Sequence, residues 1–116
     1  MMETKETTYT LCPKFEKAFS ILGKKWNGLI IDVLLQEKTQ RFVDMAHKIP
    51  MLSDRVLTER LKELEKEGII SKSEGLYQLT DKGIGLEDVL DSVRNWSQNW
   101  VNESECNFSN STDSHY

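Results

Sequence analysis

The feature that most constrains this chain is a break at Pro50, followed at once by an amphipathic helix with a signal at each end. Proline cannot continue a helix and disfavours helical geometry in the residue before it, so a preceding helix must stop here. Ser53 is placed to cap the next helix, and Gly68 to end it in a left-handed conformation. The apolar stripe between them consists of Leu57, Leu61 and Leu64. A short helix over residues 42–49, a tight turn and this longer helix predict a helix-turn-helix.

Two helices are predicted upstream of this motif. Pro13 opens the first, over residues 13–22, and Gly23 ends it. The second, over residues 26–35, has a broad apolar surface, so we expect it to be the central and most buried helix. Its inward face is expected to consist of Trp26, Leu29, Ile30, Val33 and Leu34.

A hairpin and a last helix are predicted downstream. Residues 69–79 form two short runs joined by Glu74-Gly75, which predicts a tight β-hairpin. Pairing across this turn places four side chains on one face: Ile70, Lys72, Tyr77 and Leu79. The final helix is expected to run from Thr80-Asp81 to Trp100 and to be weakened early by two glycines. Its apolar stripe consists of Leu86, Val89, Leu90, Val93, Trp96 and Trp100.

The order of these elements predicts a mainly α fold with a small β-hairpin (α+β), arranged as a winged helix-turn-helix. A chain of 116 residues has room for one domain with a modest core, which we place at residues 12–101. Residues 1–11 are expected to form a flexible arm. Residues 102–116 are polar and are expected to form a disordered tail.

Charge is divided unevenly along the chain. The formal net charge is −4, yet residues 1–72 hold 13 Lys and Arg against 11 Asp and Glu. Residues 73–116 hold 2 against 8. A nucleic-acid partner requires a local basic face rather than a basic total. The first part of the chain can therefore provide such a face, and the acidic end should point away from phosphates.

The helix that follows Ser53 carries polar side chains opposite its apolar stripe, namely Arg55, Thr58, Glu59, Lys62 and Lys66. Arg suits guanine, Glu can accept from cytosine, and a Thr methyl can touch the thymine methyl, so the first three suit base edges. Lys62 and Lys66 suit phosphates, and Ser53 at the helix start is a further candidate DNA contact. A merely solvated charged face is the alternative, and the turn before the helix and the hairpin after it argue against that alternative.

Several blocks of the sequence resemble the HxlR-type branch of the MarR-like winged-helix regulators. The longest runs from Ser53 to Ile70, and shorter ones are Gly23-Lys24-Lys25-Trp26, Arg41-Phe42 and Tyr77-Gln78-Leu79-Thr80-Asp81-Lys82-Gly83. The resemblance spans roughly residues 12 to 100. It implies a transcription regulator that binds double-stranded DNA through the helix-turn-helix. Cys12-Pro13 matches a position where many members of this branch carry a cysteine.

The resemblance also implies a homodimer in which the first and last helices pair across a twofold axis, which would match a palindromic operator. The expected interface consists of Phe15, Leu86, Val89, Leu90, Val93, Trp96 and Trp100.

The wing departs from the pattern of this branch. Two residues join its strands and the hairpin holds no arginine, so a minor-groove contact by the wing is not expected. Lys72 is its basic candidate, and the stem of this lysine can instead pack on Tyr77. Arg41, ahead of the short helix, is either a phosphate contact or an exposed structural residue.

Cys12 has two interpretations. A helix N-terminus and the nearby Lys14 favour the reactive thiolate, and in the resembling branch this cysteine is often a redox or electrophile sensor. The alternative is a small buried hydrophobic residue at the edge of the domain. Cys106 lies in the polar tail and is expected to be incidental.

Other functional classes lack support in the sequence. No His, Cys and carboxylate cluster has metal-ligand spacing, and no catalytic constellation appears, so neither a metal, a cofactor nor an enzyme is expected. No apolar run is long enough to span a membrane, and two distant cysteines suit a reducing cytoplasm. The alternative function is a winged-helix protein–protein module, because acidic and basic residues are equal in number over residues 53–72.

Overall fold

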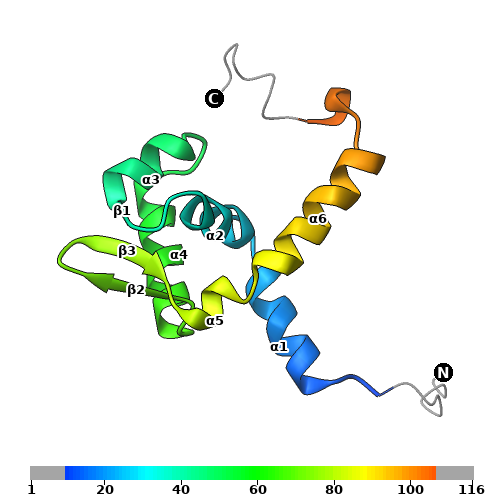
Figure 1. Cartoon of the computed structure of the whole chain (residues 1–116), viewed down its shortest axis with the longest axis horizontal. Coiled ribbons are helices and arrows are strands. Elements are labelled where there is room, and N and C mark those ends of the chain that lie inside the picture. The colour runs from blue at the N-terminus through cyan, green and yellow to red at the C-terminus, as the bar shows by residue number, and fades with distance from the viewer. Residues whose placement is uncertain (1–9, 107–116) are drawn as a thin grey trace.

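The computed structural model describes residues 10–106 (Figure 1). The elements in chain order are α1 (Pro13–Leu22), α2 (Asn27–Gln36), β1 (Gln40–Arg41), α3 (Phe42–Lys48), α4 (Asp54–Lys66), β2 (Ile70–Ser73), β3 (Leu76–Leu79), α5 (Asp81–Ile84), α6 (Glu87–Trp100) and a 3₁₀ turn, Glu103–Glu105. Figure 1 shows α2 to α5 and the sheet gathered into one body, from which α1 and α6 project on the side away from the hairpin. We call these two helices the arms.

The core lies inside the body, and α2 is central to it as predicted. Ile30, Ile31 and Leu34 of α2 are fully or almost fully buried. The predicted stripe of α4 (Leu57, Leu61 and Leu64) is buried against the same cluster, together with Met45 of α3. Each helix therefore buries one face, and the polar face of α4 is left to solvent.

The inward face of α2 differs in part from the prediction. Leu29 is exposed, whereas Asn27 is buried and its Nδ2 donates to the carbonyl oxygen of Ile21 at 2.9 Å. Trp26 precedes the helix with a left-handed φ of 82°, so α2 begins one residue later than the periodicity suggested. That backbone rotates the start of α2, which changes the residues that face inward.

The hairpin has the predicted register, with Ile70 opposite Leu79 and Lys72 opposite Tyr77. Its turn residues both have positive φ, 51° at Glu74 and 80° at Gly75, as a type I′ turn requires. The sheet has one more strand than predicted, because β1 pairs with β3 and gives the order β1-β3-β2. Residues 40–41 carry no local strand signal, and tertiary pairing makes them a strand.

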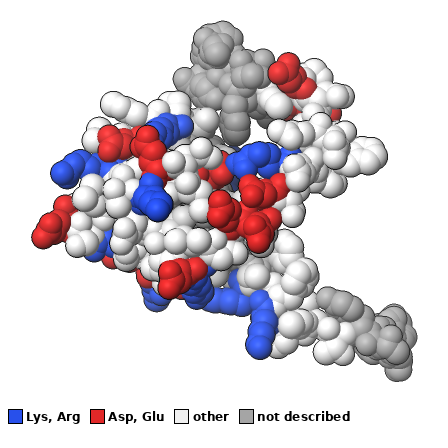
Figure 2. Space-filling model, in the orientation of Figure 1, with Lys and Arg blue, Asp and Glu red and all other residues white. Residues whose placement is uncertain are grey.

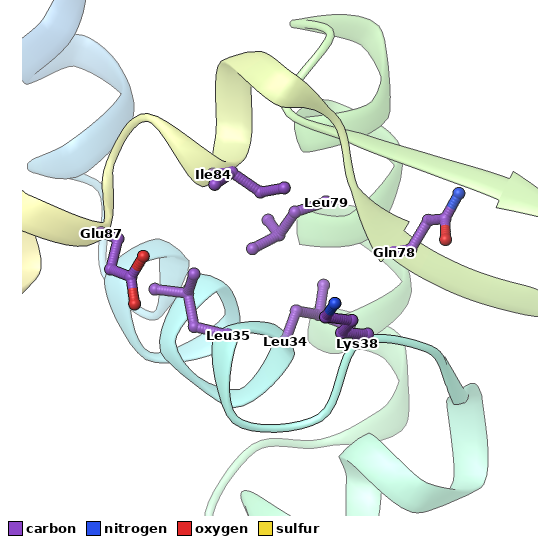
Figure 3. Close-up of a pocket in the computed structure, with 7 residues that line it drawn as sticks. All are labelled: Leu34, Leu35, Lys38, Gln78, Leu79, Ile84 and Glu87. Carbon is purple, nitrogen blue, oxygen red and sulfur yellow. The ribbon is translucent and has the colours of Figure 1, made fainter.

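The last predicted helix is two helices. α5 ends at Ile84, with Gly85 as its C-cap, and α6 begins at Glu87. Gly83 is buried where a Cβ would collide with the carbonyl oxygen of Ile69, so α5 packs closely against the residue that leads into β2. The change of direction leaves a hollow of about 260 Å³ between α2, β3 and α5, with Leu35, Leu79 and Ile84 around it (Figure 3).

The expected end segments of the chain lie mostly outside what the structure describes. Residues 1–9 of the expected flexible N-terminal segment and residues 107–116 of the expected C-terminal tail lie outside the described residues. Within the expected disordered tail, Glu103–Glu105 forms a 3₁₀ turn, and Cys106 is half-buried. Over residues 10–106, no helix is both long and apolar enough to cross a membrane.

Candidate nucleic-acid interface

The turn that precedes α4 is fixed on both sides. Ile49 and Leu52 are buried, and the backbone N–H of Leu52 donates to the carbonyl oxygen of Ile49 at 3.0 Å. Ser53 caps the helix as predicted, because its Oγ accepts from the backbone N–H of Val56 at 3.2 Å. The start of α4 is therefore held rigidly against α3, the geometry of a helix-turn-helix.

The outer face of α4 consists of Arg55, Glu59, Lys62 and Lys66, all exposed. Thr58 lies at the edge of this face. Its hydroxyl donates to the carbonyl oxygen of Asp54 at 2.8 Å, which leaves the methyl group for outside contact. In the part of the chain that the structure describes, none of the three cations on this face has an ion-pair partner.

The acidic residues of α4 are distributed in a way that the sequence did not reveal. Glu63 pairs with Lys24 at 3.1 Å and with Arg60 at 3.6 Å, and Glu67 pairs with Lys17 at 3.0 Å. These pairs turn two carboxylates toward α1 and α2. Among the four residues of the outer face three are cations and one is a carboxylate, and Asp54 and Glu65 are exposed elsewhere on the helix.

Arg41 lies at the end of β1, exposed, directly before α3. Its backbone N–H donates to Oδ2 of Asp44 at 3.1 Å, which fixes its main chain. The guanidinium extends to the wing: a Cβ added at Gly75 would lie 3.4 Å from Nη1 of Arg41. Sequence reasoning missed this proximity, since it depends on the pairing of β1 with β3.

Lys72 packs as the sequence analysis suggested. Its Nζ lies 5.2 Å from the centre of the Tyr77 ring across the hairpin. Mixed charge covers the face of the molecule in Figure 2, with acidic side chains gathered where α6 joins the body. Glu74 at the wing turn is exposed as well, so the acidic side chains are not confined to α6.

The arms present the residues predicted for dimerisation in two groups. Phe15, Val89, Val93, Trp96 and Trp100 are exposed, with 57% of Phe15 and 70% of Trp100 accessible. Phe15 stacks edge-on with Phe19, their ring centres 4.8 Å apart. Leu86 and Leu90 instead pack partly against the core of the body. One side of α6 therefore holds the helix in place, and the adjacent side is left apolar and exposed.

An ion pair joins α6 to α2 of the body. Nη2 of Arg94 lies 2.6 Å from Oδ1 of Asp32 on α2, and Nη1 lies 3.2 Å from Asp91. The hydrogen bond and the charge of Asp32 raise the pKa of Arg94 above its ordinary value. Arg94 is cationic in the folded and the unfolded chain at physiological pH, so its raised pKa does not make stability depend on pH there.

The two cysteines lie at opposite ends of the described chain. Cys12 is exposed immediately before α1, so the interpretation as a buried hydrophobic residue is wrong. Its carbonyl oxygen accepts from the backbone N–H of Glu16 at 2.9 Å, which makes it the first residue of the helical hydrogen-bond pattern. Residues 10–106 contain no group of three or more His, Cys, Asp or Glu placed to hold a metal ion.

Comparison with known proteins gives a consistent result. The family profile described as HxlR-like helix-turn-helix matches residues 21–105. The chain is 44% identical over 95 residues to the HTH-type transcriptional regulator YodB of Bacillus subtilis strain 168, covering 76% of this chain and 84% of that protein.

Solved structures are similar to this chain as well. The structure of quinone-bound YodB from B. subtilis is 46% identical, with a TM-score of 0.72, and the match covers 77% of this chain and 100% of that one. The redox regulator HypR in its oxidized form is 26% identical with a TM-score of 0.70, and the match covers 78% of this chain and 99% of that one.

Proposed function

The chain belongs to the HxlR-like helix-turn-helix family, and from this premise we propose that it regulates transcription by placing α4 in the major groove of duplex DNA. The observation that carries the proposal is the outer face of α4. Its three cations have no carboxylate partner in the described residues, while Glu63 and Glu67 are neutralised on the inner side. A rigid helix with one exposed cationic face suits a groove bordered by phosphates.

The position of each side chain along α4 suggests its role. Arg55, Thr58 and Glu59 occupy the first turns, where a recognition helix contacts base edges. Arg55 can donate to guanine, Glu59 can accept from cytosine, and the methyl of Thr58 can contact thymine. Lys62 and Lys66 lie further along, where they can neutralise phosphates and set the register. Ser53 acts through the helix start, which it caps.

A homodimer is the second part of the proposal. Val93, Trp96 and Trp100 form an exposed apolar stripe on α6, and Phe15 and its neighbour Phe19 form another on α1. Contiguous exposed apolar surface of this kind marks an interaction site. A second copy supplies the same two stripes, so a twofold axis can bury all of them. The two copies of α4 would then contact the half-sites of a palindromic operator about 34–36 Å apart.

Cys12 gives a regulatory extension of this function. It is exposed at the start of an arm, and the related structures are described as quinone-bound and oxidized regulators. The thiolate sulfur can form a bond to a quinone ring carbon, with a proton taken up so that the ring becomes a hydroquinone thioether. α1 is joined to the end of α4 by the Lys17–Glu67 pair, so a group added at Cys12 can alter the placement of α4.

The proposed function is tested by a gel-shift assay with the promoter region beside the chain's own gene. We expect a discrete complex that Arg55→Ala weakens. A chain that binds this fragment no better than unrelated duplex, and equally well without Arg55, would favour the protein–protein module instead.

The regulatory extension needs a separate assay. Binding is measured for the wild type, Cys12→Ser and Cys106→Ser, each with and without a quinone. We expect the quinone to release DNA from the wild type and from Cys106→Ser, and not from Cys12→Ser. Release that persists in Cys12→Ser would exclude this cysteine as the sensor.

A further inference from the structure

A groove of about 500 Å³ separates the wing from the start of the helix-turn-helix. The side chains along it include two cations, Arg41 from β1 and Lys72 from β2, and no carboxylate. Thr58 of α4 lines the same groove, so the groove is continuous with the outer face of α4. A cationic groove beside the helix that contacts bases is suited to a nucleic-acid backbone.

Arg41 is held at the wing turn by backbone pairing. Arg41 pairs with Leu76 of β3, and Leu76 directly follows the turn glycine, Gly75. Gly75 has a φ of 80° and no side chain, and a Cβ there would be 3.4 Å from Nη1 of Arg41. The guanidinium therefore lies against the turn itself, although it belongs to a strand more than thirty residues away in the sequence.

Lys72 is placed on the other side of the groove. Its Nζ lies over the ring of Tyr77, which is buried and therefore fixed. Within residues 10–106 neither Lys72 nor the guanidinium of Arg41 has an ion-pair partner. Two positioned cations without a counter-ion face one groove.

We propose that Arg41 makes the DNA contact of the wing: its guanidinium binds a backbone phosphate beside the Glu74-Gly75 turn, with Lys72 on a neighbouring phosphate. The strand β1 thus supplies the arginine that the two-residue turn lacks. A guanidinium can donate two parallel hydrogen bonds to a phosphate, so Arg41 suits this contact better than a point charge does. This inference rests on the proposed function, since it requires α4 to be in the adjacent major groove.

The test is the salt dependence of duplex binding by the full-length protein, followed by fluorescence anisotropy with a labelled random-sequence duplex. Loss of one phosphate contact lowers the slope of log K against log salt by about 0.9, which is about eightfold in affinity near 0.1 M salt. We expect this loss for Arg41→Ala. Arg41→Lys, which keeps the charge, should retain most of the slope. Lys14→Ala, which removes the same charge from α1, should bind like the wild type.

Two outcomes would overturn the inference. The slope could be unchanged in Arg41→Ala while Lys62→Ala lowers it, which would leave α4 on the DNA without the wing. Alternatively, Lys14→Ala could lower the slope as much as Arg41→Ala, which would reveal a net-charge effect only. Failure of the wild type to bind any duplex would contradict the proposed function as a whole, so the two failures are distinguishable.

Discussion

The body and the arms of this molecule satisfy their side chains in opposite ways. In the body, apolar residues of α2, α3 and α4 are buried in one core, and the outer face of α4 is polar and exposed. In the arms, neither α1 nor α6 has a single buried residue, and their aromatic side chains face outward. The body buries its apolar core within one chain, whereas the arms leave apolar side chains exposed. The proposed function accordingly places DNA contact in the body and assembly in the arms.

The largest effect should come from a cavity in the body. Leu61 on α4 is 1% exposed, so Leu61→Ala should lower the free energy of unfolding by about 2–5 kcal/mol. Denaturant titration at two protein concentrations measures this loss, and the loss should be the same at both. A loss below about 1 kcal/mol would mean that the core of the body is not tightly packed around α4.

A smaller effect is expected when the stripe on α6 is truncated. The double variant Trp96→Ala, Trp100→Ala should weaken the dimer by about 2–4 kcal/mol, because exposed aromatic side chains commonly dominate interfaces. Sedimentation equilibrium measures the change. The control is Lys14→Ala on α1, which removes a charged side chain and no aromatic one. A double variant that remains as dimeric as the wild type would remove α6 from the interface.

Specific binding tests the polar side of the body. Arg55→Ala should cost about 1–3 kcal/mol at the operator and relax the preference for one base. Lys62→Ala should weaken all duplexes alike and reduce the salt slope by about one unit. Competition between operator and random duplex separates the two effects. Equal losses on both duplexes in Arg55→Ala would make this residue another phosphate contact.

The smallest effect concerns the wing turn. Gly75→Ala should destabilise the protein by about 1–2 kcal/mol, since its φ of 80° is costly for a residue with a Cβ. Glu74→Asn should leave the free energy of unfolding within about 0.5 kcal/mol, because Asn-Gly suits the same turn. Thermal unfolding of both variants compares them. Equal stability of Gly75→Ala and the wild type would contradict the assigned turn.

The sequence predicts best where the signal is local. Ser53, Gly68 and the Glu74-Gly75 pair determine the start of α4, its end and the hairpin register, and each depends on neighbouring residues alone. Gly83 and Gly85 are local signals of the break between α5 and α6. The sequence analysis predicts instead a single helix that these glycines weaken at its start. The short turn after α5 shows that two closely spaced glycines can end a helix.

Distant contacts account for what could not be predicted. β1 is a strand only because Gln40 and Arg41 meet Tyr77 and Leu76. For the same reason the sequence placed Arg41 ahead of α3 and not at the wing. The pairing of Glu63 with Lys24 likewise joins residues far apart in sequence. This pairing engages the carboxylate of Glu63 away from the outer face of α4. Counting the acidic and basic residues of the helix could not show this.

The central claim is that the body contacts DNA while the arms hold two bodies at a fixed spacing. Hydroxyl-radical footprinting of the full-length protein on the promoter region beside its own gene tests both halves at once. We predict two protected patches on one face of the duplex, about 34–36 Å apart and related by a dyad. The Trp96→Ala, Trp100→Ala variant should lose the paired pattern before it loses folding. A single patch in the wild type, or a paired pattern unaffected by this variant, would contradict the account.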